Sequence, residues 1–539
     1  MPERNILLIE PGYKNKYPPL GLMKIAQYHG SEGKRDRVRF VKGEDPTVLS
    51  EAWDRVYVTT LFSFEWKRIS TAIDFAIKAA NGNTDRVFVG GIAASLMYDR
   101  FQSESRWRGV RFIRGLLDQA PAVSLQLDEF AGDFYSNDTD GKPIEDYVPD
   151  YSILEQIDYV YPVRDAYFAY ASRGCIRKCS FCGVPKLEGD LRDSTSLTHL
   201  VRSVDRLYGE KKDLTLMDNN VVASARFREI IAEIRDLGFH AGAKLARGRV
   251  AVQRRVDFNQ GVDARILCKD SMYLRELATI CLSPLRIAFD HLGLKKPYTQ
   301  AVRYAHEVGL TDLSNYMLYN FHDSPADLFE RMRLNVSLNE ELGIRIFSFP
   351  MRFQPTDRPD RGHIGEKWNR HFLRSMQVVL QATGGIVSGS PNFFKRAFGD
   401  TYQEFENILV RPHRMIFNRV YYEEGSGRPE FEQYLSDLAR LSPSQRNELL
   451  GLLAMGEPND YREYTRALAG TSQARVLEHY LPLSRAQERE IWSRARDERM
   501  TALAAAERIP EDMLVEDAGL YDEGDSMSEA ADRQPLVLA

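Results

Sequence analysis

The first third of the chain alternates short apolar runs with stretches of helical periodicity. Strands are expected at 5–10 (NILLIE), 37–41 (RVRFV), 55–61 (RVYVTTL) and 86–92 (RVFVGGI), and helices at 18–29 and 66–81. Alternation of strands and helices predicts a parallel sheet with helices on its faces. We therefore expect an α/β domain over about residues 1–115.

Residues 116–165 interrupt this pattern. The segment SNDTDGKPIEDYVPDYS is rich in turn-forming residues and has no sustained periodicity, so we assign 116–165 to a connector. A second alternating series follows, with strands expected at 166–172, 213–218, 255–265, 285–291, 315–321 and 344–350. Six β/α units suffice for a curved open sheet. The sequence thus predicts a partial barrel over 166–395.

The pattern becomes helical beyond the predicted barrel, and we expect a helical region over 396–510. Serine followed three residues later by an acidic or amide side chain predicts a capped helix start. Such pairs are Ser324 with Asp327, Ser442 with Gln445, and Ser484 with Gln487. Residues 511–539 carry nine acidic side chains and one arginine, which predicts a disordered acidic tail.

Composition narrows the function classes. The 539 residues are 43% hydrophobic and 28% charged, as in a soluble protein of several domains. A net charge of −5 argues against a general nucleic-acid binder, and no apolar run approaches the roughly 20 residues of a membrane span. The start, MPERNILLIEPG, lacks the pattern of a signal peptide. Five cysteines do not form a disulfide framework, so we expect a cytoplasmic protein.

Three of the five cysteines lie within eight residues, in RGCIRKCSFCG (173–183), and have the spacing C-x3-C-x2-C. A structural zinc site needs four ligands, but the next His is His199 and the next Cys is Cys268. A ferredoxin-type cluster also takes four cysteines. Chance clustering of buried thiols is a further alternative. A fourth interpretation accounts for the missing ligand: Cys175, Cys179 and Cys182 hold three irons of a [4Fe–4S] cluster, and the fourth iron stays open.

This motif, with the aromatic Phe181 before its last cysteine and a strand before it, resembles that of the radical S-adenosylmethionine (SAM) superfamily. The resemblance implies an oxygen-sensitive enzyme whose open iron binds the amino and carboxylate groups of SAM. An electron from the reduced cluster then breaks the C5′–S bond and gives methionine and a 5′-deoxyadenosyl radical. That radical takes a hydrogen atom from a substrate C–H bond.

The resemblance also implies SAM-binding residues at later strand ends. The family often has a Gly-Gly-Glu-like segment after the second strand, whereas this chain has MDNN, in which Asp218 and Asn219 are candidates to accept hydrogen bonds from the SAM ammonium. Gln260, Asp263 and Arg265 alternate along the expected strand 255–265 and would share a face. Arg265 is suited to the methionine carboxylate. The alternatives are a polar strand end and a structural ion pair.

Other polar residues end the fourth and fifth expected strands of this series. They are candidates for the substrate cavity, although helix capping is the commoner role of such side chains. These residues are Asp290, His291, Asn320 and His322. Within the cysteine loop, Arg177 and Lys178 are either solvated charges or a docking point for an acidic reductant of the flavodoxin or ferredoxin type.

The N-terminal segments ILLIEPG, PPLGLMKIA and FVGGIAA resemble the Rossmann-like domain of the B12-binding class of radical SAM enzymes. The resemblance implies a corrinoid above the cluster, with Gly90 and Gly91 permitting close backbone approach. The D-x-H-x-x-G motif of classical cobalamin domains is absent, so a scaffold domain without its cofactor is the alternative. The tRNA methylthiotransferases have a second cluster held by cysteines of the N-terminal domain. That group is excluded, because the first cysteine here is Cys175.

We therefore expect a radical SAM enzyme that modifies a small molecule or a peptide, either by corrinoid-dependent methylation or by hydrogen abstraction leading to oxidation, cyclisation or rearrangement. Its cofactors would be a [4Fe–4S] cluster and SAM, with cobalamin in the methylating case. The alternative is a non-enzymatic iron–sulfur or zinc protein. Cys268 and Cys281 are expected to be buried small residues outside the cluster.

Overall fold

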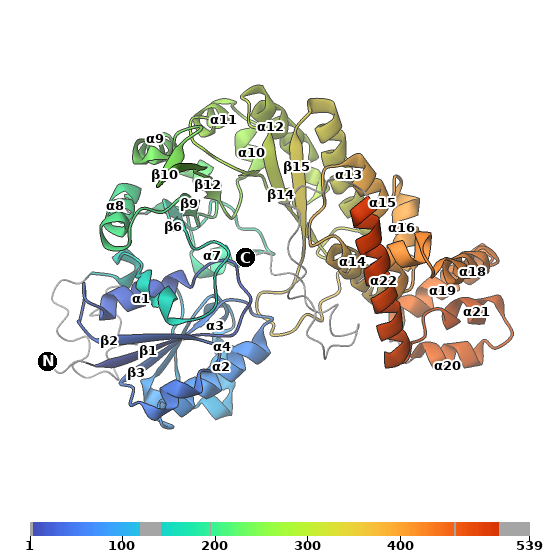
Figure 1. The fold of residues 1–539 in the computed structure, drawn as a ribbon, viewed down its shortest axis with the longest axis horizontal. Helices are drawn as coiled ribbons and strands as arrows, with labels where there is room; N and C mark the ends of the chain where they lie inside the picture. The colour runs from blue at the N-terminus through green and yellow to red at the C-terminus, as the bar shows by residue number, and fades with distance from the viewer. Residues whose placement is uncertain (1–3, 119–141, 195, 457–459, 506–539) are drawn as a thin grey trace.

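The computed structural model describes residues 4–118, 142–194, 196–456 and 460–505. Figure 1 shows an N-terminal sheet with its helices in blue, an arc of strands and helices in green and yellow, and a group of helices in orange and red. Among the helices of the described ranges there is no candidate for a membrane-spanning segment.

The N-terminal part is a five-stranded parallel sheet in the order β2-β1-β3-β4-β5. Its strands are β1 (Asn5–Glu10), β2 (Arg37–Lys42), β3 (Arg55–Thr60), β4 (Val87–Gly91) and β5 (Arg111–Phe112). Its helices are α1 (Leu20–His29), α2 (Trp66–Ala79), α3 (Ile92–Leu96) and α4 (Tyr98–Ser103). The predicted α/β pattern is confirmed, and β5 escaped prediction because two residues carry no detectable periodicity.

Strand β1 shows how this sheet joins the rest of the molecule. Its side chains alternate between two faces, as in any strand. Leu7 and Ile9 pack in a core that contains the apolar face of α2. Ile6 and Leu8 belong instead to the core that continues into the second part of the chain. One face of the N-terminal sheet and the following domain therefore share a single apolar core.

The second part is a curved parallel sheet. Its strands are β6 (Ala166–Ala169), β9 (Asp213–Leu216), β12 (Val256–Phe258), β13 (Leu285–Arg286), β14 (Asp312–Tyr319) and β15 (Arg345–Arg352). They pair in two groups, β12-β9-β6 and β13-β14-β15, all parallel. Parallel bridges from Val256 to Leu282 and from Val262 to Ile287 connect the groups. The result is the predicted partial barrel, visible as the upper arc of Figure 1.

Helices cover the outside of the curved sheet. They are α8 (Leu197–Tyr208), α9 (Phe227–Ile234), α10 (Ala264–Leu267), α11 (Met272–Leu277), α12 (Lys295–Glu307) and α13 (Pro325–Leu342). The short helix α7 (Val184–Leu187) lies instead on the side of the N-terminal sheet, beside α3 (Figure 1). Two antiparallel pairs interrupt the β/α series. They are β7 (Ser172–Arg173) with β8 (Arg192–Asp193), and β10 (Lys244–Arg247) with β11 (Val250–Gln253). Neither pair was predicted from the sequence.

One expected strand is shorter than predicted. The strand at 255–265 ends at Phe258, since Gly261 has a φ of +82° and turns the chain away from the extended direction. Asp263 then caps α10 by accepting a hydrogen bond from the backbone N–H of Arg265. The expectation that Gln260, Asp263 and Arg265 alternate along one strand face is therefore wrong.

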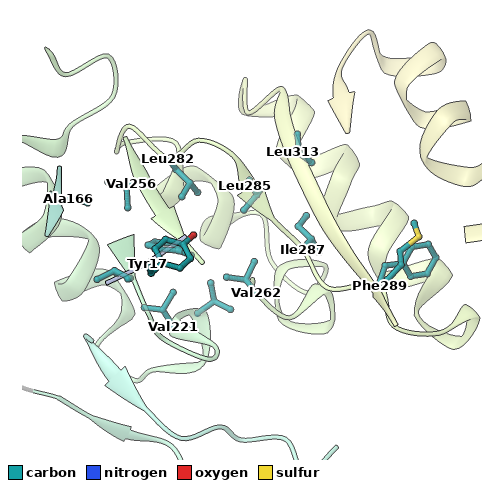
Figure 2. Close-up of a cluster of buried hydrophobic side chains, with 14 of the residues drawn as sticks. Tyr17, Ala166, Val221, Val256, Val262, Leu282, Leu285, Ile287, Phe289 and Leu313 are labelled. Atoms are coloured by element: carbon teal, nitrogen blue, oxygen red, sulfur yellow. The ribbon is translucent and has the colours of Figure 1, made fainter. Parts of the chain in front are cut away.

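Side chains hold the junction between β12 and β13, where the strand pairing is thin. Arg286 donates to both oxygens of Asp257, at 2.7 and 2.8 Å. The hydroxyl of Tyr316 donates to the carbonyl oxygen of Asn259 at 2.8 Å. Tyr17, which follows β1 of the N-terminal sheet, lies among the apolar side chains of this junction, including Val262 (Figure 2). The first domain thus contributes directly to the core of the second.

The C-terminal part consists of helices. They are α14 (Arg370–Ala382), α15 (Pro391–Phe398), α16 (Tyr402–Val410), α17 (His413–Phe417), α18 (Arg428–Ala439), α19 (Pro443–Met455), α20 (Asp460–Ala467), α21 (Ser472–Glu478) and α22 (Arg485–Ala505). The capping boxes at Ser324 and Ser442 are confirmed, and Ser484 exchanges the expected hydrogen bonds with Gln487. The predicted acidic tail, 511–539, lies outside the described residues.

Candidate functional site

The three clustered cysteines lie on one loop at the carboxyl end of the curved sheet. The loop leaves β7 through Gly174, whose φ of +75° places it in the left-handed region. A Cβ at Gly174 would lie 2.1 Å from the carbonyl oxygen of Asp190, so only glycine fits there. The backbone N–H of Cys175 donates to the carbonyl oxygen of Gly189 at 3.3 Å. Backbone contacts with the segment after α7 therefore fix the start of the loop.

Backbone N–H groups point at two of the three sulfur atoms. The N–H of Arg177 donates to Sγ of Cys175 at 3.3 Å, and the N–H of Val184 donates to Sγ of Cys182 at 3.4 Å. All three cysteine side chains are partly exposed. Hydrogen bonds of this kind stabilise thiolates and tune the potential of iron–sulfur clusters. The loop therefore presents three sulfurs, two of them already oriented by the backbone.

Burial disfavours the thiolate forms of Cys179 and Cys182. It raises the pKa of Cys182 to about 11, and the N–H of Val184 only partly opposes this effect. Burial also raises the pKa of Cys179, against the opposing charge of Arg265. A cationic metal core would supply the missing positive charge and deprotonate the thiols. The donor set thus fits an iron–sulfur cluster, whose ligands are thiolates.

The arrangement of the sulfurs also bears on the kind of metal site. Within the described ranges, no three His, Cys, Asp or Glu side chains converge so that they could hold one metal ion. In a cubane cluster each cysteine binds a different iron, so the three sulfurs need only surround a larger group.

A charged group formed by Asp263 and two arginines stands beside the cysteine loop. Asp263 accepts from Nε of Arg177 at 2.7 Å and from Nε of Arg265 at 2.7 Å. The Asp263 side chain is 7% exposed, whereas those of Arg177 and Arg265 are 34% and 37% exposed. The structure thus shows the ion pair that was the alternative for Arg265. The Arg265 side chain nevertheless stays partly exposed.

Asp290 ends the segment after β13 and lies near the same loop. Burial raises the pKa of Asp290 to about 6, although Arg331 and Arg265 oppose the shift. Asp290 in turn contributes to the raised pKa values of Cys179 and Cys182, which shows that their charges are close. The neighbouring His291 is exposed, and its pKa is lowered by partial burial and by both arginines. Asp290 is therefore the more direct neighbour of the cysteines.

Aromatic rings form an apolar wall next to the last cysteine of the motif. The ring of Phe181, from the cysteine motif, meets the ring of Phe321 edge-on at 5.7 Å between centroids. Phe321 also contacts the rings of His322, at 3.9 Å, and Phe353, at 4.6 Å. These contacts bring the loop together with the ends of β14 and β15, and they create an apolar side of the site.

Asn320 has a structural role at that wall. Its φ is +69°, and its side-chain N–H groups donate to the carbonyl oxygens of Phe353 and His363, both at 3.1 Å. Its side-chain oxygen accepts from the N–H of Gly365 at 2.8 Å. The amide of Asn320 thereby ties the end of β14 to the segment after β15.

Asp218 and Asn219 follow β9 and face the base of the cysteine loop. Asp218 is 1% exposed and accepts from the N–H of Ala171 at 2.9 Å, and from the N–H and the hydroxyl of Ser172. Asn219 donates to Glu188 at 2.9 Å. Both side chains thus hold protein groups. A contact of Asp218, Asn219 or the half-buried Gln260 with SAM stays a prediction.

Gly90 and Gly91 end β4 on the edge of the N-terminal sheet that faces the site. Gly91 has a φ of +102°, and a Cβ there would lie 2.4 Å from the carbonyl oxygen of Thr60, which accounts for this glycine without any ligand. The next helix, α3, lies beside α7 (Figure 1). A Cβ at Gly183 would lie 3.0 Å from Cδ1 of Leu96, at the end of α3. The carboxyl ends of both sheets therefore meet at the cysteine loop.

The chain is similar to known proteins over part of its length. No family model matches the chain. A curated relative, an uncharacterized methyltransferase of Synechocystis sp., is 26% identical over 226 residues, which are 40% of this chain and 38% of the relative. The match thus spans about two fifths of the relative's length.

Two solved structures are also similar. The first is TsrM from Kitasatospora setae, a radical SAM methyltransferase with cobalamin and a [4Fe–4S] cluster bound. The two structures superpose with a TM-score of 0.43 and 16% sequence identity, and the match covers 66% of this chain and 77% of TsrM. The chain is similar to a radical SAM methyltransferase. The second is SuiB of Streptococcus suis bound to the precursor peptide SuiA, with a TM-score of 0.26, 13% identity, and coverage of 40% and 45%.

Sequence reasoning missed several residues that support the site. Glu188 accepts from the N–H of Gly174 at 2.8 Å, and Arg173 pairs with both Glu188 and Glu145. Arg331 is fully buried and donates to the carbonyl oxygen of Asp290 at 3.0 Å. The position of Arg173, two residues before Cys175, could have marked it in the sequence as a residue that supports the cysteine loop. Glu145, Glu188 and Arg331 carried none, because their partners are distant in sequence.

Proposed function

We propose that this protein is a radical SAM enzyme in which Cys175, Cys179 and Cys182 hold a [4Fe–4S] cluster. The observation that carries the proposal is the placement of the three thiols on one loop, at the carboxyl edge of a parallel partial barrel, with backbone N–H groups aimed at two sulfurs. Three thiolates leave one iron of such a cluster open for SAM. The bound cluster and SAM would supply one-electron reduction and a carbon-centred radical.

The residues around the loop would bind and orient SAM. Arg265, held by Asp263, presents a cation suited to the methionine carboxylate. Asp290 is a nearby acceptor for the ammonium group. Phe321, in contact with Phe181 of the motif, provides an apolar surface that excludes water from the reacting groups.

We further propose that the reaction is a methylation that uses a corrinoid. The carboxyl edge of the N-terminal sheet faces the cysteine loop through Leu96 and Gly183, which is where a corrinoid would have to lie to meet SAM and substrate. The names of the curated relative and of TsrM support methylation. The precursor peptide bound to SuiB supports a peptide as the substrate class, alongside small molecules.

The reductant is proposed to be an acidic protein of the flavodoxin or ferredoxin type. Lys178 lies within the motif with a side chain that is 58% exposed, and Ile176 beside it is 47% exposed. A cation and an apolar side chain on the surface of the cluster loop suit transient docking of an acidic electron carrier.

Anaerobic reconstitution tests the central proposal. The wild-type protein should bind about four irons and four sulfides per chain and, with dithionite and SAM, form 5′-deoxyadenosine, or S-adenosylhomocysteine if it methylates. Cys179→Ala should lose the brown cluster and all SAM cleavage. Cys281→Ala, a buried thiol outside the loop, is the matched control and should keep both.

Zinc in place of iron, with no cleavage of SAM, would favour the alternative of a non-enzymatic metal protein. Purification after growth with cobalamin separates the two enzymatic cases. A corrinoid absorbance that stays with the protein through gel filtration supports methylation. A cluster-loaded protein without corrinoid that still forms 5′-deoxyadenosine supports hydrogen abstraction instead.

A further inference from the structure

A line of buried charges connects the N-terminal domain to the cysteine loop. It begins at Lys24 in α1, whose side chain is 6% exposed. The Lys24 ammonium donates to a carboxylate oxygen of Glu145 at 2.7 Å and to the carbonyl oxygen of the same residue at 2.6 Å. Glu145 belongs to the connector between the two domains. Lys24 and Arg173 outweigh the effect of burial on Glu145 and lower its pKa, so this carboxyl is ionised at neutral pH.

Arg173 continues the line. Its guanidinium donates to Glu145 at 2.5 Å and to Glu188 at 3.2 Å, and its side chain is 11% exposed. The same guanidinium lies over the ring of Tyr170, 3.4 Å from the centroid, a geometry that suits a cation on an aromatic face. Glu145, Glu188 and the ring of Tyr170 therefore hold the guanidinium of Arg173. This residue lies two positions before the first cysteine.

Glu188 ends the line at the loop backbone. It accepts from the N–H of Gly174 at 2.8 Å and from Asn219 at 2.9 Å, and its side chain is 8% exposed. Gly174 lies close against the backbone of Asp190, since an added Cβ would be 2.1 Å from the Asp190 carbonyl oxygen. Glu188 therefore binds the Arg173–Gly174 peptide, immediately before Cys175.

Because these ion pairs are buried, the loss of one charged partner is expected to have a large effect on stability. Exposed ion pairs such as Arg37 with Glu51 contribute little, because water screens them. Removing one member of a buried pair is costly, since the remaining charge loses its partner in a medium of low dielectric. In the line from Lys24 to Glu188, each charge has an opposite neighbour, and each of the four residues comes from a different segment.

We propose that Lys24, Glu145, Arg173 and Glu188 are positioning residues through which the N-terminal domain holds the Arg173–Gly174 peptide, at the start of the cysteine loop, in place and sets the reduction potential of the cluster. The second half of this inference rests on the proposed function. The first half concerns the protein alone and can be tested without iron.

The metal-free test is hydrogen exchange of the full chain. Lys24→Met and Glu145→Gln keep the shape of each side chain and remove its charge. Both variants should exchange faster than wild type in peptides covering 171–190, although Lys24 lies far away in sequence. Arg37→Met, which breaks an exposed pair in the same domain, is the matched control and should leave these peptides unchanged. Unchanged exchange of 171–190 in Lys24→Met would overturn the proposal.

The iron-loaded test is the midpoint potential of the reconstituted cluster. Loss of the positive Lys24 disfavours the added electron and should lower the potential, whereas loss of the negative Glu145 should raise it. The double variant should fall between the two. Purely structural damage would lower the iron content in both variants without opposite shifts, and that result would overturn the role in setting the potential. Absence of any cluster in wild type would refute the proposed function and leave the exchange test standing.

Discussion

The hydroxyl of Tyr17 donates a hydrogen bond of 2.7 Å to the side-chain oxygen of Asn259. Tyr17 follows the first strand of the N-terminal sheet, and Asn259 follows β12 of the partial barrel. The ring of Tyr17 is 8% exposed and also meets the ring of Phe168 in β6, at 6.2 Å. A side chain of one domain is thereby part of the core of the other.

This contact predicts a graded response to substitution. Tyr17→Phe removes the hydrogen bond and should cost about 1–3 kcal/mol of unfolding free energy, because Asn259 loses its donor. Tyr17→Ala also leaves a cavity and should cost about 3–5 kcal/mol. Chemical denaturation followed by circular dichroism measures both values. Equal effects of the two variants would show that the ring contributes nothing to the shared core.

Gly174 gives a prediction about the cluster loop. Gly174→Ala forces a Cβ to within 2.1 Å of the Asp190 carbonyl oxygen, so the loop must move and iron content after reconstitution should fall severely. Gly343→Ala is the matched control, because Gly343 also lies in the left-handed region, with a φ of +63°, and has open space around it. The control should lose about 1–2 kcal/mol of stability and keep its iron. Full iron content in Gly174→Ala would contradict the assigned role of this glycine.

Arg331 predicts a large loss of stability. It is 0% exposed, donates to Asp323 at 2.8 Å and binds the carbonyl oxygens of Phe289 and Asp290. Arg331→Met leaves the buried Asp323 without its cation and should cost about 3–5 kcal/mol. Arg333→Met, on the same helix but 46% exposed, should change stability by less than about 0.5 kcal/mol. Denaturant midpoints of the two variants decide the matter.

His371 predicts a pH dependence of the C-terminal helices. It is buried, stacks on His413 at 4.8 Å and donates to the carbonyl oxygen of Val410. Burial lowers the pKa of His371 from 6.5 to about 4. Between these two pH values His371 is protonated in the unfolded chain but not in the native state. The free energy of unfolding therefore falls as the pH drops from 6.5 towards 4. The full difference corresponds to about 3 kcal/mol.

Unfolding by guanidinium at pH 7 and pH 5 measures this effect. His371→Gln should reduce the difference between the two pH values, because it removes one titrating group. His306→Gln removes an exposed histidine from α12 and should leave the difference as in wild type. The same pH difference in wild type and His371→Gln would refute the assignment.

The sequence predicted those parts of the molecule that depend on local patterns. Periodicity located the N-terminal sheet and most barrel strands, serine caps located helix starts, and cysteine spacing located the loop. The prediction failed at 255–265, where RVDFNQGVDAR was expected to form one long polar strand but Gly261 and the cap at Asp263 ended it. The spacing of Asp263 and Arg265 was visible, yet their pairing depends on the helix that they begin.

Long-range charge pairs could not be predicted. Lys24 and Glu145 are separated by 121 residues, and nothing in either neighbourhood marks them as partners. The partner of Asp218 could not be predicted either. Its position after β9 suggested a contact with a ligand, but its carboxylate accepts from the backbone of the segment that enters the cysteine loop. A strand-end carboxylate has the same sequence signature whether it binds a ligand or the backbone of its own protein.

The junction between β12 and β13 has a consequence for how a protein with this fold can change in evolution. Two parallel bridges and a few side-chain contacts, chiefly Arg286 with Asp257, connect the halves of the sheet there. A continuous backbone ladder resists substitution, because its hydrogen bonds do not depend on residue type. A junction that is held by side chains, in contrast, does depend on residue type. Changes at Asp257, Arg286 or Tyr316 can therefore alter the curvature of the barrel, and with it the width of its mouth, while every strand stays intact.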